Sequence, residues 1–291
     1  MIELSIPYDS PRDLKVFLDA YGLGMRKQFG QNFLINPRAR TKLIKALDTA
    51  QGDEVWEVGP GLGAMTAELL EQGATVQAFE IDPGFIGILK ALFGAHPRFS
   101  LVEGDVLKTW RHAGGGAYLL GNLPYTIAAR LLAVLIEENR LFTRMVVTVQ
   151  REVALRMSAA PFSKDYSSFS VLCASAYTVT PLMVLKGASF YPAPHVDSQG
   201  VRLDLRTDVD PRSYPSCFKP LVRRLFSSRR KTLKNNLQSF ISSGIMKDRA
   251  KAAAQDILDR CGISEDRRAE TLRPEDFIAL AGAVEELQCG A

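Results

Sequence analysis

Cysteine and histidine are scarce in this chain. Its 291 residues include four cysteines and three histidines, all far apart, and no CxxC pair occurs. A structural zinc site needs such ligands in clusters, so we expect no metal site. Isolated thiols are typical of reduced proteins inside the cell, and no histidine stands out as a general base.

Long apolar runs are also lacking. No stretch of about 18 apolar residues predicts a membrane span. The first residues, MIELSIPYDSPRDLK, lack the basic start and apolar core of a signal peptide. We therefore expect a soluble, cytoplasmic protein with no membrane partner. An apolar fraction of 46% and a charged fraction of 23% are ordinary for a globular protein, and the length suits a large domain plus a small one.

The net charge is only +4, but it is unevenly distributed. Residues 1–150 hold 15 Lys/Arg and 16 Asp/Glu, whereas residues 151–291 hold 21 and 16. A positive excess in the second half suits an anionic partner such as nucleic acid. A solvated surface with a slight bias would give the same counts, so charge alone leaves both interpretations open.

Strand and helix signals alternate through the first part of the chain. Expected strands cover 54–58, 75–79, 99–102, 117–120 and 145–149, and expected helices cover 11–22, 37–47, 64–71, 83–93, 127–138 and 150–159. This order predicts a parallel sheet with helices on both faces. After about residue 206 only helices are expected, over 212–226, 231–241, 250–261 and 274–287. We therefore predict an α/β, Rossmann-like domain over residues 1–207 and a small all-helical domain over residues 208–291.

Three features follow successive predicted strands at their carboxyl ends, where ligands of such sheets bind. They are the turn Gly59-x-Gly61-x-Gly63, Glu80 and Asp105. The glycines allow a tight turn close to a ligand. Glu80 suits two ribose hydroxyls, and Asp105 can accept a hydrogen bond from an adenine amino group. The spacing is GxGxG rather than GxGxxG, and no P-loop occurs, which favours an adenosine with a sulfonium side chain over a dinucleotide.

The segment Asn122-Leu123-Pro124-Tyr125 follows the fourth predicted strand. An exocyclic aromatic amine is a poor nucleophile because its lone pair is delocalised into the ring. The Asn122 side-chain oxygen and a backbone carbonyl near Leu123-Pro124 can accept hydrogen bonds from such an amine and localise that pair. Tyr125 can stack on the flat base. The loop thus needs only to position and polarise, without a general base or a metal.

A second notable segment runs from Ser189 to Ser198, SFYPAPHVDS. Its prolines stiffen an extended loop that can display Phe190 or Tyr191. An aromatic ring there could hold a base on the face opposite Tyr125, as expected when a base leaves its stack. A proline-rich link to the last strand is the alternative interpretation.

Several motifs together resemble the KsgA/RsmA family. They are GQNFL at 30–34, EVGPGLG at 57–63, EID at 80–82, GD at 104–105, GNLPY at 121–125, QREVA at 150–154, FYPAPHVDS at 190–198, RRKTLKNNL at 229–237 and RAETL at 268–272. The resemblance spans roughly residues 22–280. It implies a class I methyltransferase domain with a mostly parallel seven-stranded sheet and a helical C-terminal domain.

The resemblance also implies chemistry and site residues. The family dimethylates the N6 amines of two adjacent adenosines in a hairpin near the 3′ end of 16S ribosomal RNA, with S-adenosyl-L-methionine as the donor. The expected cofactor contacts are Asn32, Leu34, Gly59, Glu80, Asp105 and Asn122, to which the turn analysis adds Gly61. The expected target-base contacts are Asn122, Leu123, Pro124, Tyr125 and Phe190. Departures from the family pattern are Asn36 in place of Asp, and Phe162 and Ser167 in place of glycines.

Residues 202–234 hold ten Lys/Arg and three Asp, so these cations cannot all pair with acids of the same segment. Phosphate contact is their natural use, and a solvated basic helix is the alternative. The expected RNA-binding residues are Arg223, Arg224, Arg229, Arg230, Lys231 and Lys234, and Arg26 and Lys27 could add to the same face.

The leading hypothesis is a 16S ribosomal RNA adenine dimethyltransferase linked to small-subunit biogenesis, acting as a monomer on the small subunit or its precursor. A related enzyme of the antibiotic-resistance type, acting on large-subunit RNA, is less favoured because Leu123 stands where that group commonly has Ile. A non-catalytic assembly factor is the third alternative.

Overall fold

The computed structural model describes residues 5–24, 30–242 and 250–289. The chain forms two compact units. Unit 1 comprises Met1–Leu132, Leu141–Ala154 and Val179–Leu205, and unit 2 comprises Ala133–Arg140, Leu155–Thr178 and Arg206–Ala291. The predicted domain boundary after residue 207 lies close to the last point at which the chain passes from unit 1 to unit 2, between Leu205 and Arg206. Unit 2 also includes two earlier segments of the chain.

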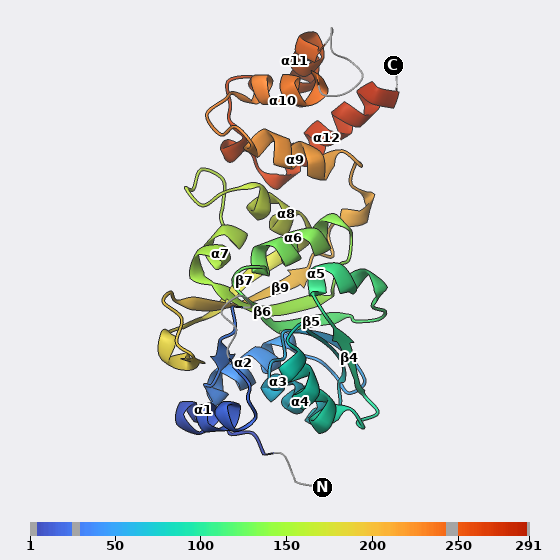
Figure 1. Cartoon of the computed structure of the whole chain (residues 1–291). Coiled ribbons are helices and arrows are strands. Elements are labelled where there is room, and N and C mark those ends of the chain that lie inside the picture. The colour runs from blue at the N-terminus through green and yellow to red at the C-terminus, as the bar shows by residue number, and fades with distance from the viewer. Residues whose placement is uncertain (1–4, 25–29, 243–249, 290–291) are drawn as a thin grey trace. The chain divides into compact units, whose positions relative to one another are not determined.

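A seven-stranded sheet carries the predicted parallel arrangement (Figure 1). Its order is β4-β3-β2-β5-β6-β9-β7. The strands are β2 (Glu54–Val58), β3 (Thr75–Glu80), β4 (Phe99–Glu103), β5 (Tyr118–Asn122), β6 (Arg144–Gln150), β7 (Tyr177–Leu185) and β9 (Ser198–Leu205). Strands β4, β3, β2, β5 and β6 run parallel, and β9 is antiparallel to β6. The predicted mostly parallel seven-stranded sheet is confirmed.

A separate two-stranded pairing joins β1 (Phe33–Leu34) to β8 (Phe190–Tyr191). The two strands are antiparallel, with Phe33 opposite Tyr191 and Leu34 opposite Phe190. The sequence did not predict this pairing, because two-residue strands leave no periodic signal. Its effect is to bring two of the family-like motifs together.

The helices of unit 1 begin where the sequence places caps. They are α1 (Pro11–Ala20), α2 (Pro37–Leu47), α3 (Ala64–Glu71), α4 (Pro83–Phe93), α5 (Val106–Thr109), α6 (Ala128–Glu137) and α7 (Arg151–Met157), of which α6 and α7 run on into unit 2. Asn36 accepts a hydrogen bond from the amide of Ala39 at 3.1 Å, and Pro37 occupies the first helical position. The change from the family's Asp to Asn therefore keeps the cap.

The core of unit 1 lies between the central strands and helices α2 and α3. Leu43 and Leu47 of α2 and Leu69 of α3 pack against buried residues of β2, β3, β5 and β6. Adjacent side chains of a strand point to opposite faces, so Trp56 of β2 lies on the other face, against Phe79 and Phe142 at centroid distances of 4.7 and 5.2 Å. The strands are thus buried on both faces, as parallel strands usually are.

Unit 2 contains α8 (Ser168–Ala176), α9 (Phe218–Phe226), α10 (Leu233–Ser242), α11 (Ala250–Arg260) and α12 (Pro274–Cys289). The expectation of one helix over 212–226 was wrong. A short 3₁₀ turn covers Pro211–Ser213, and Tyr214 is extended because Pro215 follows it. Helix α8 and strand β7 were also not predicted. None of the helices in the described ranges is long and apolar enough to cross a membrane.

A glycine substitution tests the packing of the sheet. Gly116 has φ +80°, and a Cβ there would lie 2.4 Å from the Cδ1 atom of the buried Trp56 ring. We expect Gly116→Ala to lower the unfolding free energy by about 1–3 kcal/mol, because the ring cannot yield and the backbone is unfavourable for Ala. The measurement is denaturant unfolding. Gly114→Ala is the matched control, since open space surrounds its Cβ; equal effects of the two changes would contradict the packing argument.

Candidate active site

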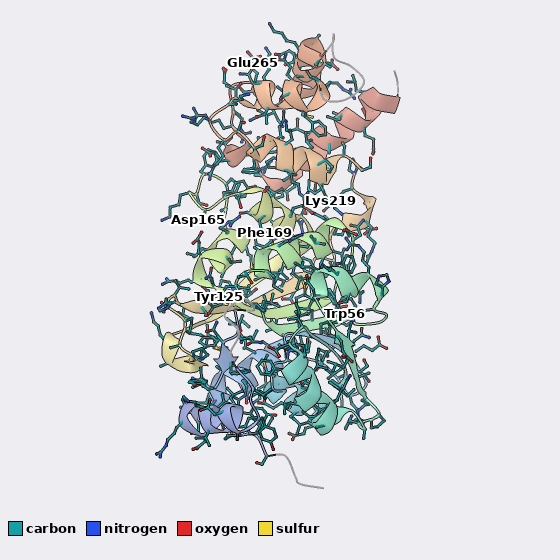
Figure 2. The ribbon with its side chains drawn as sticks, viewed as in Figure 1. Trp56, Tyr125, Asp165, Phe169, Lys219 and Glu265 are labelled. Carbon is teal, nitrogen blue, oxygen red and sulfur yellow. The ribbon has the colours of Figure 1, made fainter. Side chains whose placement is uncertain are left out.

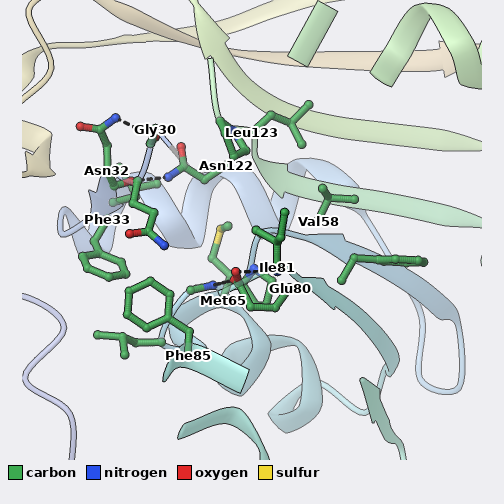
Figure 3. A pocket seen from close by; sticks show the side chains of 18 of the residues that line it. Gly30, Asn32, Phe33, Val58, Met65, Glu80, Ile81, Phe85, Asn122 and Leu123 are labelled. Carbon is green, nitrogen blue, oxygen red and sulfur yellow. Dashed lines mark hydrogen bonds between the residues drawn. The ribbon is translucent and has the colours of Figure 1, made fainter. Parts of the chain in front are cut away.

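A cavity of about 320 Å³ opens within unit 1 at the carboxyl ends of β2, β3, β4 and β5 (Figure 3). This volume is within the usual range for a small-molecule site. All the expected cofactor residues line it, namely Asn32, Leu34, Gly59, Gly61, Glu80, Asp105 and Asn122, together with Leu123, Pro124 and Tyr125. Parallel strands end at one edge of the sheet, which is why residues so far apart in sequence meet here.

The glycine turn after β2 forms part of the cavity wall. Gly59 and Gly61 have φ values of +71° and +60°, which side-chain-bearing residues rarely adopt. A Cβ on Gly61 would come within 2.9 Å of the Phe33 ring. The turn therefore requires glycine both for its backbone and for the room it leaves.

Glu80 ends β3 with its carboxylate held by backbone amides. Oε2 accepts from Gly61 N at 3.1 Å, and Oε1 accepts from Ile81 N and Asp82 N, each at 2.9 Å. A carboxylate offers about four acceptor positions, so capacity for one more donor remains, as a ribose hydroxyl requires. Burial raises the pKa of Glu80 to about 7, and the three amide bonds oppose that rise.

Asp105 follows β4 and caps helix α5. Its Oδ1 accepts from Leu107 N at 2.9 Å. This bond fixes the carboxylate at the cavity wall and leaves further acceptor capacity for an amino group. Ile81 and Val106 line the same cavity as apolar neighbours of these two acids.

The catalytic candidate Asn122 is oriented by a main-chain contact. Its Nδ2 donates to the carbonyl oxygen of Asn32 at 2.6 Å (Figure 3). No donor from the described part of the chain reaches its Oδ1. The amide therefore presents an acceptor, which is what polarising an amine requires.

The backbone carbonyls of Leu123 and Pro124 also differ in whether a donor occupies them. Pro124 O accepts from Ile127 N at 3.0 Å and from Ala128 N at 3.1 Å, so the start of α6 uses it. Among the described residues no amide donates to the carbonyl of Leu123, whose own N–H donates to Thr148 O at 3.1 Å. Of these two carbonyls, Leu123 O is therefore the one that meets the expectation of a backbone acceptor in this loop.

The hydroxyl of Tyr125 shares a short hydrogen bond with Oγ of Ser198, the last residue of the SFYPAPHVDS segment. Burial raises the pKa of Tyr125 above its ordinary value. The phenol therefore stays neutral at physiological pH, as a stacking ring should, and it is poorly suited to act as a base.

The structure does not bring Phe190 to the cavity. Its side chain is only 3% exposed and packs in the core between β8 and helix α2. Tyr191, its neighbour, is half-buried and packs on the cluster that contains Phe85. Stacking of Phe190 on a base requires it to leave this position, and that role stays a prediction.

Sequence reasoning missed several residues of the cavity. Tyr8, Arg40 and Phe85 line it, and Phe33 and Phe85 meet edge to face at 5.4 Å. Arg40 donates to Leu34 O at 2.9 Å and pairs with Asp9 at 2.5 Å. A single tyrosine near the N-terminus, and single arginine and phenylalanine residues within helices α2 and α4, carry no spacing signal for a site, so nothing in the sequence singled them out.

A buried acid that the sequence analysis left without a role precedes Val58, a residue of the cavity wall, without lining the cavity itself. Glu57, in β2, is fully buried, and its Oε2 accepts from the Thr66 hydroxyl at 2.6 Å, whereas Oε1 has no partner among the described residues. Burial raises the pKa of Glu57 to about 7, and the charge of Glu80 raises it further. Two acids thus share a poorly solvated part of the fold.

These residues fit an adenosine with a positively charged sulfonium side chain. The lining holds two acids, Glu80 and Asp105, and one cation, Arg40, whose guanidinium is occupied by Leu34 O and Asp9. Such a lining suits a cationic ligand and offers little to a pyrophosphate. The fold and this site define a class I S-adenosyl-L-methionine-dependent methyltransferase.

The comparisons with known proteins agree with that class and narrow it. The family model described as "Ribosomal RNA adenine dimethylase" matches residues 22–280. The chain belongs to this family.

Relatives and solved structures give the same picture. "Ribosomal RNA small subunit methyltransferase A" of Treponema pallidum is 44% identical over 96% of this chain and 98% of its own length, and the protein of the same name from Treponema denticola is 42% identical over 96% of both. A dimethyladenosine transferase from Plasmodium falciparum is 26% identical over 84% of this chain and 94% of that one, with a TM-score of 0.71. The 23S rRNA methyltransferase ErmE, at 20% identity and a TM-score of 0.62 over 87% of this chain and 99% of its own, shares the fold.

Most of the cations expected to bind RNA have partners within unit 2. Arg223 pairs with Glu137, Lys234 with Glu265, and Arg229 with Glu270 at 2.9 Å, while Arg224 bonds Ser239. Arg230 and Lys231 are exposed and have no side-chain partner in the described ranges. Arg26 and Lys27 lie outside the described residues. No group of three or more potential metal ligands occurs among the residues described.

The buried acids predict a pH dependence of stability. A group whose folded pKa is raised above its unfolded value stabilises the fold below the unfolded value, and this stability is lost as the pH rises through the folded one. Glu57 has an ordinary pKa of 4.5 and a folded pKa of about 7. We therefore expect Glu57→Gln to match the wild type near pH 4 and to be more stable than it at pH 8.

The measurement is urea unfolding from pH 4 to pH 8. Gln keeps an oxygen for Thr66, so the hydrogen bond survives. Glu71→Gln, at an exposed position of α3, is the control and should leave the pH profile unchanged. A Glu57→Gln profile parallel to that of the wild type would refute the buried-charge account.

Proposed function

We propose that this enzyme dimethylates the N6 amines of two adjacent adenosines in a hairpin near the 3′ end of 16S ribosomal RNA. The observation that carries the proposal is the orientation of Asn122, a cavity residue whose Nδ2 donates to Asn32 O, so that its Oδ1 is left without a donor among the described residues. The names of the small-subunit relatives support the choice of RNA. We expect the chain to act in the cytoplasm as a monomer, on the small subunit or its precursor.

The residues of the chain position and polarise the amine. When bound, S-adenosyl-L-methionine supplies a methyl group already activated by its sulfonium. Asn122 Oδ1 and Leu123 O accept hydrogen bonds from the two N–H groups, which localises the nitrogen lone pair toward the methyl donor. Tyr125 offers a neutral ring for the base to stack on. After transfer the amine carries a positive charge and releases its proton to solvent, so no general base is required.

The arrangement accommodates a second transfer. After the first methylation the amine keeps one N–H, which still finds one of the two acceptors. Apolar Leu123 and Ile127 line the cavity and can contact the first methyl group. Two transfers to one nitrogen therefore use the same loop.

The decisive assay is methyl transfer from labelled S-adenosyl-L-methionine to three substrates. These are under-methylated small subunits, large subunits and free 16S ribosomal RNA, each followed by nucleoside analysis. Dimethyladenosine should form in small-subunit RNA. Its formation only in large subunits would support the antibiotic-resistance type of enzyme, and no transfer to any substrate would support a non-catalytic assembly factor.

Removal of the polarising amide tests the mechanism. We expect Asn122→Ala to lower kcat by about 10²–10³-fold, the cost of losing one preorganised polar contact. Donor affinity, measured by calorimetry, and the thermal midpoint should change much less. Near-normal turnover would reject the role of Asn122. Equal losses in donor affinity and turnover would instead point to the Asn32 contact as its main contribution.

Substitution of the cations at positions 229–231 tests the proposed RNA-binding surface. Exchange of Arg229, Arg230 and Lys231 for Ala should weaken RNA binding and flatten its salt dependence, by about 0.7–0.9 in the slope of log K against log salt for each phosphate that is no longer bound. The pair Arg230 and Lys231 should account for most of this, since Glu270 holds Arg229. The control is the double exchange of Arg223 and Arg224 for Ala. It removes as much charge as the exchange of Arg230 and Lys231, but from side chains that already have partners. A slope unaltered by the triple exchange contradicts the assignment.

A further inference from the structure

Phe162 of unit 2 combines two unfavourable features. It has φ +68°, one of three positive values at non-glycine residues in the described chain. Its side chain is 77% exposed. A bulky residue in the left-handed region is strained, and an exposed aromatic ring gains nothing from burial. Fold stability alone therefore does not explain an aromatic side chain here.

The loop that carries Phe162 is fixed by many hydrogen bonds. Phe162 N donates to Glu270 O at 2.9 Å, and Ser163 Oγ donates to Ala160 O at 2.8 Å. Tyr166, buried at the other end of the loop, donates its hydroxyl to Leu272 O at 2.8 Å. The backbone thus holds the ring outward, which lowers the entropy cost of using it in binding.

The segment lies between α7 and α8, where Figure 1 shows a projecting loop and Figure 2 labels its Asp165. Ser167, in the same segment, also stands where the family pattern has glycine, but its backbone is not strained. Ser167 has an extended φ of −153° and begins α8 in a capping box with Ser170. The strain is confined to the position that carries the ring.

One cation contacts the loop that carries this ring, and two more follow it in the sequence. Arg229 donates to Lys164 O at 3.4 Å and pairs with Glu270, the residue whose carbonyl holds Phe162. Arg230 and Lys231 follow Arg229 and have no side-chain partner among the described residues. The acids in or bonded to this loop are Asp165 and Glu270, and Glu270 is already paired with Arg229.

A single exposed ring on a loop that a cation contacts suits a nucleobase better than a protein surface. Protein interfaces have an apolar core built from several side chains. In unit 2 the other exposed large apolar side chain among the described residues is Leu155 of α7. Base stacking needs only one ring, with cations for the flanking phosphates.

We propose that Phe162 stacks on an unpaired base of the substrate RNA, while Arg230 and Lys231 contact the adjoining phosphates. This contact belongs to unit 2, whereas the cavity residues belong to unit 1, and it rests on the proposed RNA substrate. It gives RNA recognition an element that reads an exposed base rather than charge alone.

The test compares Phe162→Gly, Phe162→Trp and wild type on an unmethylated 16S ribosomal RNA transcript free of protein. Glycine relieves the strained φ, so Phe162→Gly should keep or raise the thermal midpoint. Its RNA affinity should fall by about tenfold, within the range measured for loss of one stacked base. The salt slope should stay unchanged, because every phosphate keeps its cation. Phe162→Trp should bind as the wild type does, and its added indole fluorescence should be quenched by RNA.

Three results would overturn the proposal. They are wild-type affinity of Phe162→Gly, an unquenched indole in Phe162→Trp, and weaker binding seen only with intact small subunits, which would indicate contact with a protein. If Phe162→Gly failed to fold, Phe162→Trp would still decide the question. Failure of the wild type to methylate small-subunit RNA would refute the proposed function separately, since binding to the transcript is read without turnover.

Discussion

In the proposed mechanism, the chemistry of the site depends on the hydrogen bond from the Asn122 amide to the Asn32 carbonyl. An amide side chain has a donor end and an acceptor end, and a bond of 2.6 Å to a main-chain oxygen fixes the nitrogen as the engaged end. The oxygen is then available without any further residue to hold it. The bond also ties the loop after β5 to the 30–34 segment, so the amine-binding and donor-binding parts of the cavity share one structural element.

Burial of Glu57 and Glu80 disfavours their ionised forms. Glu80 is useful only as an acceptor, yet burial raises its pKa to about 7. Three backbone amides offset part of that cost, which is the usual way to keep a buried carboxylate ionised. Glu57 has one hydroxyl partner and one orphaned oxygen, so the same charge is less well compensated there. A cationic donor near these acids would favour their ionised forms, and donor binding and proton release should therefore be coupled.

How much of this could be predicted depends on the kind of signal. The sheet, the caps and the cavity residues at strand ends follow from periodicity and from glycine, proline and acid positions, so β2, α2, α3 and α4 were placed with their observed bounds. Strand β7 was missed because its exposed and buried positions do not alternate and it contains Pro181. The β1–β8 pairing, and with it the burial of Phe190 against α2, is a tertiary contact between two-residue strands. Arg40 and Tyr8 reach the cavity only through folding of the N-terminal segment.

The distribution of paired and unpaired cations bears on specificity. Three of the six cations expected to bind RNA form ion pairs and a fourth bonds a serine, so the number of these cations overstates how many are available to phosphates. With few free cations, non-specific attraction to RNA is modest, and discrimination must come from contacts that depend on RNA shape. The proposed contact of Phe162, a ring held outward by a strained backbone, is of this kind, because it requires an unstacked base. On this proposal, recognition selects a looped RNA before a target adenine reaches Asn122, and a small polarising loop can then act on two adjacent adenosines of a long RNA.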